Sequence, residues 1–168
     1  YELVRQNKRS ELVEAFESIK KEPLSRAELA MFTDAADRAK NELSAQVYGQ
    51  AMEKLRAKRW QEAASLFEES LRLKDDSSIT PSVKLGLAQS YRGLGRHKDA
   101  IPILTQLADN TVDREVCDDA LYFLAMSQTD LEAWNDAKNT WRTMLRRFPD
   151  SRYAAEGRIY LKSLEILH

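Results

Sequence analysis

The sequence is poor in the residues that form reactive or cross-linked sites. Its 168 residues include one cysteine, Cys117, and two histidines, His97 and His168. A single cysteine excludes an internal disulfide, and Cys117 lies in an apolar helical stretch where we expect it to be buried. Two histidines, one of them terminal, provide no evident metal site or nucleophile–base pair. We therefore expect no enzymatic activity, no cofactor and no metal.

Chain-breaking residues and net charge are also scarce. The chain has five glycines and four prolines, and its 26 basic and 27 acidic residues nearly cancel, to a formal net charge of -1. Few breakers favour long helices over a turn-rich sheet. Balanced charge provides no overall field that would recruit nucleic acid or an anionic membrane. Apolar runs fall short of the roughly 18 residues of a membrane-spanning helix, so we expect no direct membrane insertion.

What the sequence does contain is an internal repeat with a period of 37 residues. Alanines recur at this period in two series, the second 12 residues after the first: Ala51, Ala88 and Ala125, then Ala63, Ala100 and Ala137. A ring precedes each alanine of the second series by three residues: Trp60, His97 and Trp134. Small residues let two helices approach closely, and the ring residue would wedge the turn between them. Each unit is therefore predicted to be a helical hairpin.

The segment from Ala51 to Pro149 resembles the tetratricopeptide repeat family, which has small residues on both helices, an aromatic residue near the turn and a closing proline. The period of that family is about 34 residues, so the links between hairpins are expected to be longer here. The stretch from Phe148 to Ala154 is similar to the link between repeats in bacterial envelope proteins of this family. Examples are the TolA-associated cell-division coordinator and the lipoprotein of the outer-membrane β-barrel assembly machine. The resemblance implies an all-α, right-handed solenoid of antiparallel hairpins.

An N-terminal helical segment is predicted over residues 1–43. Its first helix, from residue 2 to 21, would be stopped by Pro23. Ser25 is expected to cap the second helix, because Glu28 follows it at the spacing of a capping box. The second helix either continues to about residue 58 or breaks near residues 41–44.

Three hairpins and a closing helix are predicted to form one globular unit with this segment. The hairpins cover about 44–78, 81–112 and 116–149. The closing helix covers 151–167, and we expect its apolar residues to cap the last hairpin. These residues are Ala155, Ile159, Leu161, Leu164 and Ile166.

The first helices of the hairpins are expected to form a concave, partner-binding face. The repeat register places nine side chains there: Tyr48, Met52 and Arg56, then Leu85, Gln89 and Arg92, then Tyr122, Met126 and Asp130. A tyrosine with a methionine four residues later, found twice, suits a partly apolar peptide or helix in a groove. Arg92 is a candidate to hold a carboxylate. Alternatively, the tyrosine–methionine pairs pack against the N-terminal helices of the chain itself.

We therefore predict a non-enzymatic scaffold that binds a peptide or helix of a protein partner, within a bacterial, cell-envelope complex. The alternative is a structural protein that forms homo-oligomers, through the tyrosine–methionine face or through an apolar seam of Leu29, Phe32 and Ala36. The chain begins with Tyr1 rather than Met, so we expect a targeting or anchoring segment to have been removed. A periplasmic or membrane-associated location is the first expectation, and a cytoplasmic one the alternative.

Overall fold

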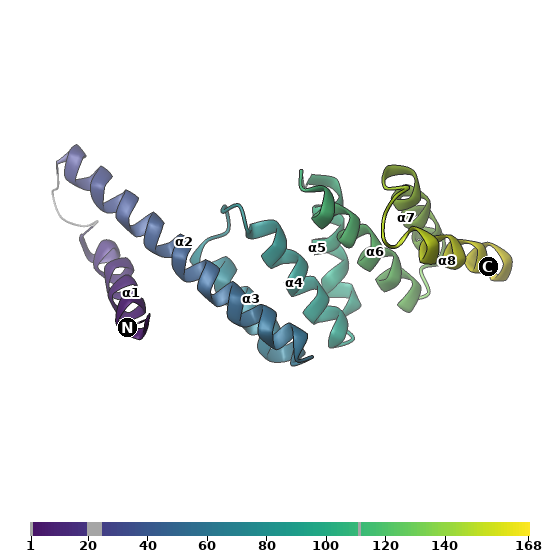
Figure 1. Ribbon diagram of the computed structural model, residues 1–168, viewed down its shortest axis with the longest axis horizontal. Coiled ribbons are helices and arrows are strands. Elements are labelled where there is room, and N and C mark those ends of the chain that lie inside the picture. The colour runs from purple at the N-terminus through teal and green to yellow at the C-terminus, as the bar shows by residue number, and fades with distance from the viewer. Residues whose placement is uncertain (1, 20–24, 111) are drawn as a thin grey trace.

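A computed structural model of the chain describes the backbone of residues 2–19, 25–110 and 112–168, and the side chains of these residues except 2–7 and 19. Within these ranges the chain forms eight α-helices and no strand, so the expected all-α fold is confirmed. The helices are α1 (Glu2–Ile19), α2 (Arg26–Arg56), α3 (Trp60–Leu73), α4 (Thr80–Gly93), α5 (His97–Asn110), α6 (Arg114–Asp130), α7 (Trp134–Arg147) and α8 (Ala154–Leu167). They follow one another along the long axis of the molecule (Figure 1).

Helices that are adjacent in sequence pack against each other as antiparallel pairs. The hairpins are α2–α3, α4–α5 and α6–α7, and α3 packs on α4 as α5 packs on α6. The first helices of neighbouring hairpins also touch, α2 with α4 and α4 with α6. Contacts confined to near neighbours are typical of a solenoid. The tetratricopeptide-like array predicted from the period is therefore confirmed.

The repeated alanines lie inside the hairpins. All six are fully buried, at 0% exposure: Ala51, Ala63, Ala88, Ala100, Ala125 and Ala137. Phe67, Leu104 and Trp141 follow the second alanine of each hairpin by four residues and are equally buried. A methyl group at the crossing lets the helices approach, and the larger side chain one turn later fills the space between them.

The three ring residues at the starts of α3, α5 and α7 are half-buried. The ring of Trp60 covers Gly93, where an added Cβ atom would lie 2.3 Å from the indole. Trp134 stacks on His168, with 4.0 Å between ring centroids, which holds this last residue against the start of α7. The rings therefore lie at the hairpin turns, with part of each ring open to solvent.

Helix α2 is continuous over 31 residues, so no break occurs near residues 41–44. The capping box at its start is confirmed. Ser25 Oγ accepts the Glu28 N–H at 3.3 Å, and the Glu28 carboxylate accepts the Ser25 N–H at 3.0 Å. Helix α1 packs along α2 (Figure 1), with an ion pair between Arg9 and Glu42. Pro23, predicted to stop α1, lies outside the described residues.

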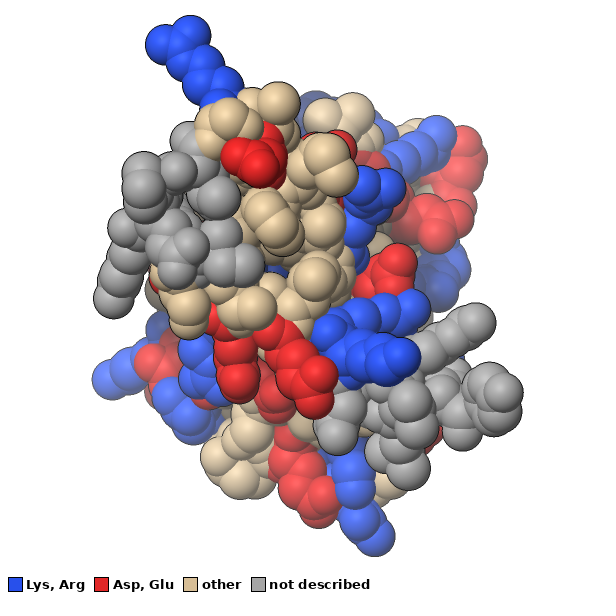
Figure 2. Space-filling view, turned by 90° about the vertical axis from the view of Figure 1, so that its left-hand side faces the viewer, with Lys and Arg blue, Asp and Glu red and all other residues tan. Residues whose placement is uncertain are grey.

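The end of the molecule formed by α1 and the start of α2 has mixed charge. Lysines and arginines alternate with aspartates and glutamates around uncharged surface (Figure 2). Leu29 and Phe32 of the predicted seam are exposed there, but Ala36 is buried. The seam ends at Ala36 because the buried face of α2 begins there and continues through Ala39 and Leu43.

Helix α8 closes the last hairpin with only part of its apolar surface. Leu164 and Gly157 are buried, and Gly157 lies against Trp141. The prediction that Ala155 caps the hairpin is wrong, because Ala155 is exposed, and it is equally wrong for Ile159 and Ile166, which are 68% and 71% exposed. They are seven residues apart and share a helix face that turns away from α7. None of the described helices combines the length and apolarity needed to cross a bilayer.

Candidate functional site

The predicted groove residues lie on α2, α4 and α6, the first helices of the three hairpins. Leu85 is a correction: at 8% exposure it belongs to the hydrophobic core. Helix α4 is enclosed by α3, α5 and α6, and the side chain of Leu85 packs among α5 and α6 residues such as Leu107 and Leu121. The side chain of Leu85 is therefore not available on the surface of α4.

The first tyrosine–methionine pair packs on its own hairpin. Tyr48 and Met52 on α2 are half-buried against the core, and the ring of Tyr48 lies 6.0 Å from that of Phe67 on α3. Arg56, one turn after Met52, is exposed. Tyr48 and Met52 are therefore held by the core on one side and accessible to solvent on the other.

The second tyrosine contacts the C-terminal part of the chain. Tyr122 stacks on Tyr153 with 3.9 Å between centroids, and its hydroxyl donates to Glu156 at 3.1 Å. Burial is the main cause that raises the pKa of Tyr122 to about 12, and this hydrogen bond adds to the increase. Met126 is half-buried against the same core cluster. Tyr122 therefore joins α6 to the link before α8.

The remaining groove residues meet in a cavity of about 540 Å³, which we call the Arg92 pocket. It is lined by residues from four helices: Trp60, Gln89, Arg92, Gly93, His97, Phe123 and Asp130. Arg92 belongs to the last turn of α4, and its guanidinium lies over the ring of Phe123 on α6, 5.0 Å from the centroid. Burial lowers the pKa of the Arg92 guanidinium, since it disfavours the charged form.

Asp130 is the acidic residue of the Arg92 pocket, and its contacts there are long. Its Oδ2 atom lies 3.9 Å from Arg92 Nη2 and 3.6 Å from His97 Nδ1. Both distances exceed the usual length of a hydrogen bond. Arg92 Nε and His97 Nδ1 are buried and have no hydrogen-bond partner among the described residues. The pocket therefore holds polar groups that its own walls leave unsatisfied.

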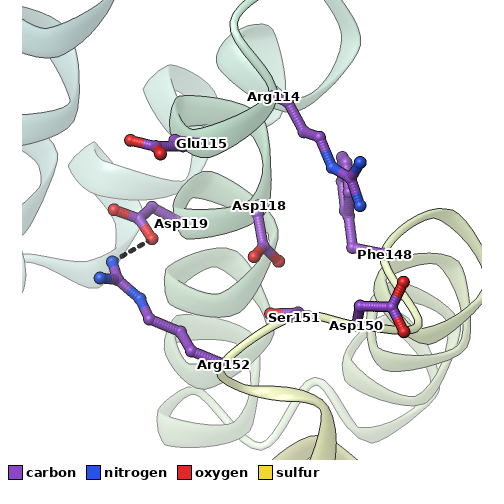
Figure 3. A pocket seen from close by; sticks show the side chains of 8 residues that line it. All are labelled: Arg114, Glu115, Asp118, Asp119, Phe148, Asp150, Ser151 and Arg152. Atoms are coloured by element: carbon purple, nitrogen blue, oxygen red, sulfur yellow. Dashed lines mark hydrogen bonds and ion pairs between the residues drawn. The ribbon is translucent and has the colours of Figure 1, made fainter.

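A second cavity, of about 340 Å³, lies where the link between α7 and α8 crosses the start of α6 (Figure 3). We call it the acidic pocket, and it is lined by Arg114, Glu115, Asp118, Asp119, Phe148, Asp150, Ser151 and Arg152. Asp119 accepts hydrogen bonds from Arg152 Nη2 at 2.5 Å and from the Tyr153 hydroxyl at 3.0 Å. The Asp118 carboxylate points toward Ser151 in Figure 3, and its Oδ1 atom is buried without a described hydrogen-bond partner.

Sequence reasoning missed the acidic pocket. Its signal was the pair Asp118 and Asp119 near a helix start, which on its own indicates only a favourable interaction with the helix dipole. The pocket forms because the link folds back over residues some thirty positions earlier, a contact anchored by Arg152. In the part of the chain that is described, no three side chains are grouped as metal ligands.

Cys117 is buried next to this region, as expected. It is 1% exposed, and its thiol donates to the Ala108 carbonyl at 3.3 Å. Burial raises the pKa of the thiol, which leaves less of the reactive thiolate at neutral pH. The environment of Cys117 is therefore that of a packed core residue.

The sequence of this chain matches a known protein family. Residues 40–165 match the family YfiO, described as an outer membrane lipoprotein. A search of curated proteins found no match. The matched segment begins in α2 and ends in α8, so it contains helices α3 to α7 and both pockets. It also confirms the resemblance to bacterial envelope tetratricopeptide proteins. Because the match extends over well more than half of its length, the chain belongs to the YfiO family of outer membrane lipoproteins.

Proposed function

We propose that this chain is a scaffold of a bacterial envelope assembly complex and binds a segment of a partner protein along the faces of α2, α4 and α6. Family membership supports a role among assembly components rather than enzymes. The observation that carries the proposal is the Arg92 pocket, where a half-buried cation, two aromatic rings and an amide meet between α4 and α6. Such a mixture suits a peptide with both apolar and polar side chains.

The proposed contact strip follows the described side chains. It keeps Tyr48, Met52, Arg56, Gln89, Arg92 and Met126. Leu85 leaves the strip because it is buried, and Tyr122 leaves it because Tyr153 and Glu156 already occupy its ring and hydroxyl. A partner segment would pass from the α2 end, across the Arg92 pocket, toward α6.

Site-specific photo-crosslinking in the parent cells tests the proposal. A photoreactive residue at Met52 or Gln89 should give a discrete adduct with another envelope protein. The same residue at Ser65 or Glu69, exposed on α3, serves as the matched control. Adducts that form equally from α3, or from neither face, would exclude the strip as the binding surface.

Self-assembly is the second candidate function, and exposed apolar residues at both ends of the array favour it. Leu29 and Phe32 lie at one end, and Ile159 and Ile166 at the other. Light scattering across concentrations tests this function directly. A larger species that returns to the monomer mass in an Ile159→Lys, Ile166→Lys variant would establish it, whereas a monomer at every concentration would exclude it.

A further inference from the structure

We infer that the Arg92 pocket receives the carboxylate of an aspartate or glutamate in the partner segment, with apolar partner residues beside it. This inference rests on the proposed function, because it specifies what the concave face binds. The inference names the chemical class of the ligand, which is an acidic side chain within an apolar sequence. It assigns recognition of this side chain to the Arg92 guanidinium.

The first support is that Arg92, a cation whose side chain is largely covered, is poorly paired. Its side chain is 17% exposed, and its ion pair with Asp130 is 3.9 Å long. Its Nε atom has no described hydrogen-bond partner. A guanidinium has five N–H donors, and a buried donor without an acceptor costs free energy. An incoming carboxylate would satisfy these donors and form the charge-assisted bonds for which arginine is suited.

Two other arginines of this chain lie over aromatic rings and also have a close carboxylate partner. Arg96 lies over the ring of Tyr91, and Arg152 over that of Tyr153, as Arg92 lies over Phe123. Arg96 nevertheless donates to Asp99 at 2.7 Å, and Arg152 donates to Asp119 at 2.5 Å. Arg92 has the same aromatic support but lacks such a close carboxylate among the described contacts.

The carboxylate of Asp130 can be displaced from the Arg92 pocket by a partner carboxylate. It is 43% exposed and lies at the C-terminal end of α6, so water can solvate its carboxylate without help from the pocket. The same Oδ2 atom is the nearest acid to both Arg92 and His97, and it is close to neither. A partner carboxylate that enters between Arg92 and His97 therefore replaces weak contacts and loses little.

The walls of the pocket favour apolar neighbours for that carboxylate. Phe123 supports one face of the guanidinium, and Trp60 lines the cavity next to Gly93. Gln89 can bond to the partner backbone, since its amide both donates and accepts. The ligand that fits is an acidic residue next to an apolar or aromatic one.

The test uses the full chain and a display library of short random peptides. We expect the chain to select peptides in which an aspartate or glutamate adjoins an apolar residue. A selected peptide should bind about tenfold or more tightly than its analogue with glutamine or asparagine at the acidic position. Arg92→Gln should abolish this difference, whereas Arg72→Gln, which removes the same charge from exposed surface on α3, should preserve it.

Asp130→Asn provides an independent, gain-of-affinity arm. Removing the competing carboxylate should tighten binding of the acidic peptide several-fold and leave the amide analogue unchanged. If circular dichroism shows that Arg92→Gln loses helicity, the Asp130→Asn variant becomes the deciding test. An unchanged affinity for the acidic peptide would then overturn the inference.

The outcomes separate this inference from the proposed function. Selection of peptides without acidic residues, or equal binding of the acid and amide forms, would overturn the carboxylate site and leave the groove in place. Failure to select any peptide above a bait-free control would overturn the groove, and the inference with it.

Discussion

Ser44 on α2 and Ser70 on α3 exchange hydrogen bonds across the first hairpin. The Ser44 hydroxyl donates to the Ser70 carbonyl at 3.0 Å, and the Ser70 hydroxyl donates to the Ser44 carbonyl at 2.9 Å. Both residues are fully buried. Their short side chains allow the backbones to come close enough for this exchange, which a larger residue would prevent. The contact therefore fixes the crossing of α2 and α3 at one point.

Removing either hydroxyl should weaken the hairpin. We expect Ser44→Ala and Ser70→Ala each to lower the free energy of unfolding by about 1 kcal/mol, the usual net value of a buried hydrogen bond. Ser65→Ala is the control, because Ser65 is exposed and bonds only within α3. Urea denaturation measures all three. Equal losses at Ser65 and Ser44 would show that the buried exchange adds nothing.

Two glycines in helices should respond to alanine with opposite signs. A Cβ atom at Gly86 would lie 2.3 Å from the buried ring of Phe67, whereas at Gly49 it would meet nothing within 4 Å. Gly86→Ala should therefore destabilise by about 1–3 kcal/mol through overpacking. Gly49→Ala should stabilise by about 0.5–1 kcal/mol, because glycine disfavours a helix interior. Thermal unfolding of both variants checks the signs, and a loss at Gly49 would contradict this account.

The turns inside the hairpins share a left-handed residue at equivalent positions. Lys58, Gly95 and Glu132 have φ angles of 57°, 72° and 59°. Glycine adopts this conformation without strain, whereas other L-residues lose about 1 kcal/mol or more. Glu132→Gly should therefore stabilise by roughly 1 kcal/mol, and Gly95→Ala should destabilise by a similar amount. Denaturant midpoints that move in the same direction would show that these turns are not strained.

The free energy of unfolding should begin to fall at alkaline pH while the other contacts between the helices are still intact. Burial raises the pKa of Tyr91, Tyr122 and Tyr153 to about 12, with help from a nearby carboxylate in each case. An unfolded tyrosine ionises near pH 10, so between about pH 10 and pH 12 the unfolded state alone releases protons. Stability conferred by these groups is thus complete below about pH 10 and is lost as the pH rises toward 12.

Denaturation at a series of alkaline pH values measures this loss. Tyr153→Phe, which keeps the stacked ring and removes the ionising group, should make the decline shallower. Tyr48→Phe is the comparison variant, because it makes the same change in a half-buried tyrosine on α2. Equal slopes for the wild type and Tyr153→Phe would remove Tyr153 from the explanation.

The hairpins were predictable from sequence because a close helix crossing demands a small residue at fixed spacing. Ala63 and Ala100 reveal that spacing directly, and Phe67 and Leu104 follow from helix geometry. Exposure was less predictable. Leu85 holds the register of a groove residue yet is buried, because its exposure depends on how α5 and α6 approach α4. The period sets how often hairpins occur and leaves the angle between them open.

For the same reason, only part of the Arg92 pocket could be predicted from the sequence. Gln89 and Arg92 share one helix, so the register alone brings them to one face. Phe123 and Trp60 come from other hairpins, and their meeting with Arg92 depends on the superhelical arrangement. The closeness of His97 to Asp130 likewise required the structure.

The extra length of α2 makes it a lever. Lys74, at the end of α3, ties to Asp37 at 3.8 Å, and α2 continues past this tie toward its cap at Ser25. That free arm is about 18 Å long, so tilting it by about ten degrees at Asp37 would swing its tip by about 3 Å. Helix α1 is tied to α2 on the other side of Asp37, because Arg9 pairs with Glu42 and Glu17 pairs with Lys40. A small bend in α2 at Asp37 would therefore move its N-terminal turns relative to both α1 and the three hairpins.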